Sequence, residues 1–288
     1  MNNVMPINGA KKQYDTEDAK AFINKIQCIT SVKLICQLTQ AVQQHRGATL
    51  GYLSGEDAFL SIAERQSQMI DKLFASYLLH NGFSADLPGP VEVSNSLDSW
   101  QVIKFDWQSD ELLHNFEFHS HLVDNLKKII RGHMRDTLMP DRHTMAPGYE
   151  LLLETVFITL PNTIEELAKL RGLSTNAAVV QACGSDSHTR LSFLLKDIPR
   201  LLLALEQALE NIIEDYPEFD VIRPGRGQQR RLNALLKKIN TNILNSRKIQ
   251  EDSTQLFRAA TDIIDAFWLS MEVAIQRMEQ LQYRSFIA

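Results

Sequence analysis

Long apolar segments are missing from this sequence, and so is any targeting signal at its start. No stretch of about 18 apolar residues occurs, which is the length that a membrane-spanning helix needs. Residues 1–14 are polar and lack the apolar core of a signal peptide. From these absences we expect a cytoplasmic protein with no membrane partner.

Cysteine is scarce, because only Cys28, Cys36 and Cys183 occur and no pair has C-x-x-C spacing. An odd number of thiols without metal-ligand spacing predicts neither a disulfide framework nor a zinc site. We therefore interpret the three thiols as core residues of a protein from a reducing compartment.

An excess of positive charge is also absent, since the formal net charge is −5. An extended nucleic-acid surface needs a basic stripe, so we expect no direct nucleic-acid partner. The sequence contains no P-loop, dinucleotide fingerprint, His-Glu-x-x-His pattern or nucleophile elbow. We therefore predict a protein that is not an enzyme and has no cofactor.

Two groups of polar residues have the composition of a site but a simpler interpretation. The first follows steps of three, four and three along a helix: His114, Glu117, His121 and Asp124. Side chains at this spacing share one face and could hold a divalent metal. That face lies away from the apolar stripe, so we interpret it as solvated and predict no metal site. The second, residues 184–188, contains Ser, Asp and His at a helix start and indicates a cap, not a catalytic triad.

Helical periodicity fills most of the chain, with apolar residues recurring every three or four positions. Residues 91–93 could form a short extended piece, and Pro161 and Pro199 are expected to break or kink their helices, with a new cap at 162–166. Long helices with short connections pack antiparallel, so we predict an all-α fold of two packed antiparallel helical bundles. The expected helices cover about 17–52, 56–82, 96–105, 110–138, 149–160, 162–183, 185–215, 228–245 and 252–281.

The domain prediction follows from one internal linker, residues 139–148, which lies near the midpoint. We expect a flexible leader over 1–15 and a single helical module over 16–288, with halves of about 16–138 and 149–288. Helical pattern continues to Phe286, so we expect no separate output domain.

Two arginines interrupt apolar stripes on long helices. Arg46 takes an apolar position between Val42 and Leu50, and Arg171 does the same after Leu167. Each arginine precedes a glycine and other small residues, which let another helix approach closely. A guanidinium keeps its charge at neutral pH, so a buried arginine needs an anion from the protein or from outside. The pattern predicts two half-sites, one in each half of the chain.

Two segments resemble those of the nitrate- and nitrite-sensing (NIT) domain family: His45-Arg46-Gly47-Ala48-Thr49 and Leu170-Arg171-Gly172-Leu173-Ser174. The resemblance covers most of the chain. It implies a bacterial sensor domain that pairs two helical bundles and binds the anion with arginines between helices. Some members have a second arginine before the first, and this sequence has His45 there.

The predicted anion site has six residues: Arg46, Arg171, Arg231, His45, Thr49 and Ser174. Arg231 follows Arg230 at a helix start, where the helix amino end favours anions. The alternatives are that Arg46 and Arg171 pair with internal acids, and that Arg230 and Arg231 form a solvated basic turn. The other three residues are then ordinary packing residues at a helix interface.

These expectations combine into a cytoplasmic sensor that reversibly binds nitrate or nitrite and signals by rearranging its bundles. Two arginines that face one monoanion repel each other until the anion binds, so the ligand favours one arrangement of the helices. The signal would pass to a separate downstream protein or through self-association of the last helix. The alternative function is a helical adaptor or scaffold that binds another protein and no small anion.

Overall fold

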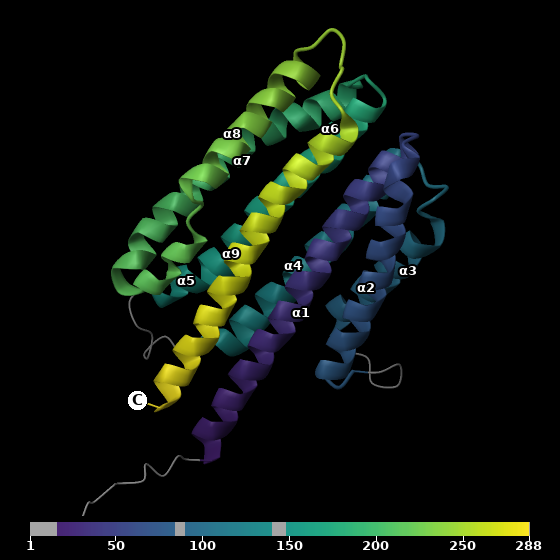
Figure 1. Cartoon of the computed structure of the whole chain (residues 1–288). Coiled ribbons are helices and arrows are strands. Elements are labelled where there is room, and N and C mark those ends of the chain that lie inside the picture. The colour runs from purple at the N-terminus through teal and green to yellow at the C-terminus, as the bar shows by residue number, and fades with distance from the viewer. Residues whose placement is uncertain (1–15, 84–89, 140–147, 288) are drawn as a thin grey trace, which may run out of the picture.

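The computed structural model describes residues 16–83, 90–139 and 148–287. Over these ranges the chain contains helices and turns and no strand, which confirms the predicted all-α fold (Figure 1). The expected leader and most of the 139–148 linker lie outside the described residues. Within the described ranges, no helix combines the length and the apolar character needed to cross a membrane.

The N-terminal half is organised around the long helix α1, which packs on both α2 and α4, while α3 packs on α4. Short 3-10 or π turns carry the label η. The elements are, in chain order, α1 (Thr16–Leu53), η1 (Asp57–Phe59), α2 (Leu60–His80), α3 (Val91–Asp106), α4 (Leu112–His133) and η2 (Met134–Leu138).

The C-terminal half is organised around α6, which packs on α7 and α9, while α8 packs on α9. The elements are, in chain order, α5 (Tyr149–Glu154), η3 (Thr155–Thr159), α6 (Leu160–Val179), α7 (Ser185–Asp215), η4 (Pro217–Ile222), α8 (Arg226–Ile239), η5 (Asn240–Leu244) and α9 (Ser253–Ile287).

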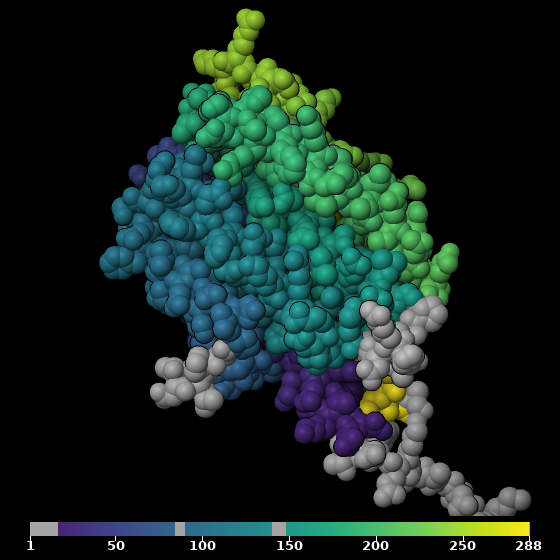
Figure 2. Space-filling model, turned by 180° about the vertical axis from the view of Figure 1, so that it is seen from behind, coloured from purple at the N-terminus to yellow at the C-terminus, as the bar shows by residue number. Residues whose placement is uncertain are grey.

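The two halves meet where α1 packs on α6 and on α9. Figure 1 shows α1 and α9 side by side and running in opposite directions. In the view from behind, α1 is visible only near its ends, because teal and green residues cover its middle (Figure 2). Residues 41–51 of α1 are buried apart from the partly exposed Gln44, so a polar side chain in this part of the helix must find its partners inside the molecule.

Glycines allow α1 and α6 to approach closely. A Cβ on Gly172 would lie 2.8 Å from Cδ1 of Leu50 and 4.0 Å from the Cα of Gly47. A Cβ on Gly47 would lie 3.0 Å from Nε of Arg171 and 3.0 Å from the ring of Phe257 on α9. The two Arg-Gly steps of the sequence thus meet at one helix crossing, as their small residues predicted.

Residues 91–93 are helical, so the expectation of a short extended piece is wrong. They form the first turn of α3, and the amide of Val93 donates to the carbonyl of Pro90 at 2.8 Å. Val93 is also buried, and packing of this kind outweighs the weak preference of valine for strands.

The break expected at Pro161 is also wrong, because α5, η3 and α6 form one continuous helical run. Pro161 has no amide hydrogen for the carbonyl of Phe157, and the chain passes through a π turn directly before it. The cap expected at 162–166 is helix interior, where the hydroxyl of Thr163 donates to the carbonyl of Thr159 at 2.9 Å. The helix α7 continues through Pro199, as the predicted helix over 185–215 requires, and the kink expected at Pro199 stays a prediction.

Candidate functional site

The Arg46 side chain is fully buried at the crossing of α1 with α4 and α6. Its Nη1 and Nη2 donate to Oε1 and Oε2 of Glu165 at 2.7 and 3.0 Å, so the ion pair is bidentate. Nη1 also donates to the hydroxyl of Ser120 at 2.9 Å. The guanidinium carbon lies 5.2 Å from the centroid of the Phe116 ring. One of the two arginines therefore has an internal acid, as the alternative interpretation required.

Glu165 is fully buried and ionised at neutral pH. Burial alone would raise the pKa of Glu165. The charge and hydrogen bonds of Arg46, together with the charges of Lys169 and Lys127, lower the pKa by more than burial raises it, so it lies below its ordinary value. Nε2 of Gln43 donates to Oε2 at 2.8 Å, and Nζ of Lys169 lies 3.9 Å from Oε1. The carboxylate thus links α1 to α6.

Arg171 is equally buried but its partners are neutral. It donates to the main-chain carbonyl of Gln43 and to the hydroxyl of Thr261 at 3.1 Å. Its guanidinium carbon lies 5.0 Å from the centroid of the Phe257 ring. Among the described residues, no carboxylate forms an ion pair with it. Burial and the charge of Arg46 lower the pKa of Arg171 to about 10, so the side chain is still protonated at neutral pH.

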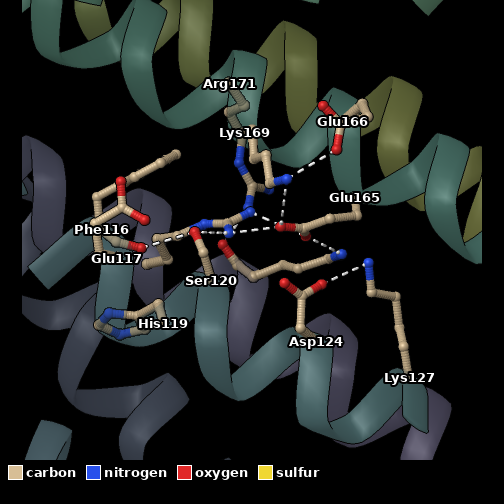
Figure 3. Close-up of polar contacts among 12 residues, drawn as sticks. Phe116, Glu117, His119, Ser120, Asp124, Lys127, Glu165, Glu166, Lys169 and Arg171 are labelled. Atoms are coloured by element: carbon tan, nitrogen blue, oxygen red, sulfur yellow. Dashed lines mark hydrogen bonds and ion pairs between the residues drawn. The ribbon is translucent and has the colours of Figure 1, made fainter. Parts of the chain in front are cut away.

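The buried cluster, which consists of Arg46, Arg171 and Glu165, therefore carries more positive than negative charge. Among the described residues, the cluster holds two buried guanidinium groups and one buried carboxylate, that of Glu165, which pairs with Arg46. Asp265 is only half-buried and accepts hydrogen bonds from Gln40 and Gln44, and its charge acts on Arg171 without forming an ion pair with it. In the part of the chain that the structure describes, nothing accepts a hydrogen bond from Nε of Arg46 or Nε of Arg171. Figure 3 shows Arg171 extending from α6 toward the polar group around Glu165 and Ser120.

Gln43 joins the parts of this cluster. Its side chain donates to Glu165 and accepts a hydrogen bond from Nε1 of Trp268 at 3.2 Å, while its main-chain carbonyl accepts from Arg171. Trp268 belongs to α9, so Gln43 connects α1, α6 and α9 at this point.

His45 lies on the other side of α1 and contacts α4. Nδ1 of His119 faces the carbonyl of Asn115 at 2.7 Å, so this nitrogen carries the hydrogen and Nε2 of His119 is an acceptor. Nδ1 of His45, 2.7 Å away, donates to it. His45 Nε2 then holds a buried lone pair beside the rings of Trp100 and Trp107. Burial lowers the pKa of both histidines, that of His119 to about 3.

The hydroxyls of the other two predicted donors are engaged locally. Thr49 is buried and donates to Oδ1 of Asn115 at 2.7 Å. Ser174 donates to the carbonyl of Arg171 at 3.2 Å, one turn earlier on the same helix. Both residues fit the alternative interpretation of ordinary packing residues at the helix interface.

Arg231 is not brought to the crossing. It lies exposed on α8, as does Arg230, and none of the described hydrogen bonds or ion pairs connects it with Arg46 or Arg171. Leu232, Leu235 and Ile239 form the buried face of α8, and the arginine side chains lie outside that face. The structure thus favours the solvated basic turn over an additional cation in the cluster.

Sequence analysis missed Glu165, Gln43, Ser120 and His119. A signal was present for two of them. Glu165 shares a helix face with Ala168 and Gly172, and a carboxylate on a face of small residues indicates burial. Ser120 stands four residues after Phe116 in an apolar stripe. Gln43 and His119 left no comparable pattern, because their roles depend on contacts between distant segments.

The polar groups that were interpreted as surface features are exposed. His114 pairs with Glu111 at 3.4 Å, and Glu117 pairs with Arg190 at 2.6 Å. At the start of α7, the amide of His188 donates to the carbonyl of Gly184 at 2.8 Å, as a helix start requires. Cys28 and Cys36 are buried thiols, and Cys183 is partly buried.

Comparisons with known proteins add no relative. No protein-family model matches the chain, and neither the curated proteins nor the solved structures contain a significant match. The resemblance to the NIT family therefore stays a prediction, and the argument for function depends on the buried cluster itself.

Proposed function

We propose that this protein is a sensor that reversibly binds nitrate or nitrite at the crossing of α1 and α6, without chemical conversion. One observation carries the proposal: of two fully buried guanidinium groups only that of Arg46 pairs with a buried carboxylate, and the Nε of each has no partner among the described residues. A buried unpaired cation is costly, and a monoanion beside Arg171 would balance it.

The chemistry of Arg171 fits a small planar oxyanion. A guanidinium is planar and weakly hydrated, and it offers parallel N–H donors that match two oxygens of a delocalised anion. Arg171 uses its two Nη atoms for neutral acceptors and keeps Nε unpartnered. An anion that displaced one neutral acceptor would gain a bidentate, charge-assisted contact.

The proposed donors are fewer than the sequence predicted. Arg171 is the primary donor and Arg46 the second, because both belong to the buried cluster. The hydroxyl of Thr261 and the side chain of Gln43 replace Arg231 as additional groups near the anion. His45, Thr49 and Ser174 position the surrounding helices, since their polar atoms point to other partners.

Binding would change the packing of three helices. Gly47 touches Arg171 so closely that even a methyl group at this position would meet its Nε at 3.0 Å. An anion needs more room than a methyl group, so its entry has to separate α1 from α6 or α9. The long helix α9 carries Thr261 and Trp268 at this point and would pass the change to a downstream protein or to a second copy of the chain.

A cytoplasmic location belongs to the same proposal. Cys28 and Cys36 are buried as free thiols, a state that a reducing compartment preserves.

A second candidate function is a helical adaptor that binds another protein and no anion. The bidentate Arg46–Glu165 pair favours it, because this arginine already has an internal counter-ion with good geometry. The adaptor interpretation requires Arg171 to be stable with neutral partners alone.

The test is the thermal midpoint of unfolding in sodium chloride and in sodium nitrate at matched ionic strength. A ligand that binds only the folded state raises the midpoint with its concentration. We expect a nitrate-specific rise in the parent that is lost in Arg171→Met, which keeps the side-chain volume and removes the charge. Arg231→Ala, on the exposed side of α8, is the matched control and should keep the rise. Equal midpoints in both salts for the parent would favour the adaptor.

A further inference from the structure

Glu165 stands between a buried cation and a partly exposed one. Its Oε1 lies 2.7 Å from Nη1 of Arg46 on α1 and 3.9 Å from Nζ of Lys169 on α6. The Lys169 side chain is 25% exposed, whereas Arg46 is fully buried. A movement of about 1 Å would bring Oε1 within hydrogen-bond distance of Lys169.

We propose that Glu165 is a built-in competitor of the anion: a bound anion replaces its carboxylate on Arg46, and the carboxylate moves to Lys169. This inference depends on the proposed function, since it describes how that same site is regulated.

The hydrogen bonds of Arg46 require such an exchange. Nη1 donates to Glu165 and Ser120, Nη2 donates to Glu165, and only Nε has no acceptor among the described atoms. A planar anion binds best to two parallel N–H groups of one guanidinium. Arg171 can offer such a pair by giving up one neutral acceptor, whereas Arg46 can do so only after the charged carboxylate of Glu165 has left.

Lys169 is able to receive the displaced carboxylate. Its ammonium group has three donors, and the described contacts use one of them for Glu166 at 2.8 Å. Lys127, the next cation, is held by Asp124 at 2.8 Å and by Asn162 at 3.3 Å. The cations that act on Glu165 are therefore Arg46 and Arg171 on one side and Lys169 and Lys127 on the other, and the two lysines pair with Glu166 and Asp124.

The exchange would convert a contact between helices into a contact within one helix. Arg46 belongs to α1 and Glu165 to α6, so their ion pair ties the two halves of the molecule together. Lys169 lies one turn after Glu165 on α6, and an ion pair between them releases Arg46 of α1 from α6. The anion would then connect the helices in a different geometry, which is the structural change that a sensor needs.

The experiment is calorimetric titration of sodium nitrate into the full chain at constant ionic strength, in two buffers of different ionisation enthalpy. Comparing the buffers gives the number of protons taken up on binding. The variants are Glu165→Gln and Lys169→Met, and the control is Lys237→Met on the exposed side of α8. Circular dichroism and thermal melts verify that each variant is folded.

We expect Glu165→Gln to bind nitrate about tenfold more tightly than the parent, because no charged competitor has to leave. We expect Lys169→Met to bind more weakly and to take up close to one proton, because the displaced carboxylate then lacks a cation and becomes protonated. The parent and the control should bind alike with little proton uptake.

The outcomes separate this inference from the proposed function. Parent binding together with an unchanged affinity in Glu165→Gln, or with no proton uptake in Lys169→Met, overturns the competitor and leaves the sensor standing. Absence of binding in every folded variant overturns both. Binding that appears only in Glu165→Gln shows that this carboxylate competes with the anion, but it overturns the sensor, because the parent itself has to bind nitrate. If Glu165→Gln does not fold, the proton uptake of Lys169→Met decides alone.

Discussion

Arg46 and Arg171 stand at equivalent positions of two similar segments, yet their surroundings differ. Arg46 has a carboxylate in bidentate geometry, whereas Arg171 has a carbonyl, a hydroxyl and an aromatic ring. Burial of both arginines was predictable, because each interrupts an apolar stripe. The sequence did not predict which arginine pairs with a carboxylate, because Glu165 is 119 positions away from Arg46 in the sequence.

The buried ion pair leads to a prediction about stability. Removing one partner of such a pair leaves an uncompensated charge and costs about 3–5 kcal/mol, while replacing both by apolar residues costs far less. We expect Arg46→Met and Glu165→Leu each to lower the free energy of unfolding by that amount in urea titrations. The double variant should recover most of the loss.

The control for this cycle is Arg200→Met, which removes an exposed partner of Asp197 and should change stability by less than about 1 kcal/mol. Additive effects of the two single substitutions would show that Arg46 and Glu165 do not stabilise each other.

The two buried histidines predict an acid sensitivity that begins near neutral pH. Burial lowers the pKa of His45 and lowers that of His119 to about 3, so the folded protein keeps both neutral. The unfolded chain binds protons at its ordinary pKa near 6.5. Stability is therefore fully present above that pH and is lost as pH falls toward 3, by up to about 1.4 kcal/mol per pH unit for each histidine.

The measurement is the free energy of unfolding between pH 7.5 and 5 for the parent, His119→Asn and His114→Asn. The control is His114→Asn, which replaces an exposed histidine that pairs with Glu111. A slope in the parent no steeper than in His119→Asn would show that the buried pair takes up protons without unfolding. Below pH 4.5, loss of the Glu165 charge adds to the effect, because its folded pKa is also depressed.

At the scale of the element, small residues decide how closely helices pack. The stripe predicted for the first helix includes Val42, Arg46 and Leu50, and all three are buried. The bounds of this helix agreed within a residue. The sequence misled where a local preference conflicted with packing, at the valines that begin α3 and at the proline that follows η3.

Glycine substitutions test the close packing. A Cβ on Gly51 would lie 2.3 Å from the ring of Phe59, so Gly51→Ala has to displace an aromatic side chain and should destabilise the fold by about 1–3 kcal/mol. Gly132 lies in α4 with nothing within 4 Å of an added Cβ. Gly132→Ala should therefore be neutral or stabilise by up to about 1 kcal/mol. Thermal or urea unfolding of both variants gives the answer, and equal effects would refute the described packing.

At the scale of the whole molecule, the two halves are connected through α1, α6 and α9, and the charge imbalance lies at this connection. The all-α class followed from periodicity alone. The position of the buried cluster was predicted only in part. The sequence predicted that the two Arg-Gly segments would meet, but it also placed Arg231 in the site, and this residue lies exposed on the surface. Long-range packing decides such questions, and no local pattern records it.

The proposed signal predicts where hydrogen exchange should respond to nitrate. Amides of α1, α6 and α9 around the cluster should change their protection, because an anion beside Arg171 has to separate these helices. Amides of α2 and α3 should stay as they are, since none of the described hydrogen bonds, ion pairs or ring contacts of Arg46, Arg171 and Glu165 reaches either helix. A uniform change over all helices would instead indicate general salt stabilisation, and Arg171→Met should abolish the local response.

The most direct measurement is a crystal structure of the protein grown in sodium nitrate, compared with one grown in sodium chloride. The account predicts a planar anion within hydrogen-bond distance of Nε of Arg171, with the α1–α6 crossing wider than in chloride. A nitrate crystal in which Arg171 keeps only Gln43, Thr261 and Phe257 as partners, with the crossing unchanged, would contradict the sensor and favour the adaptor.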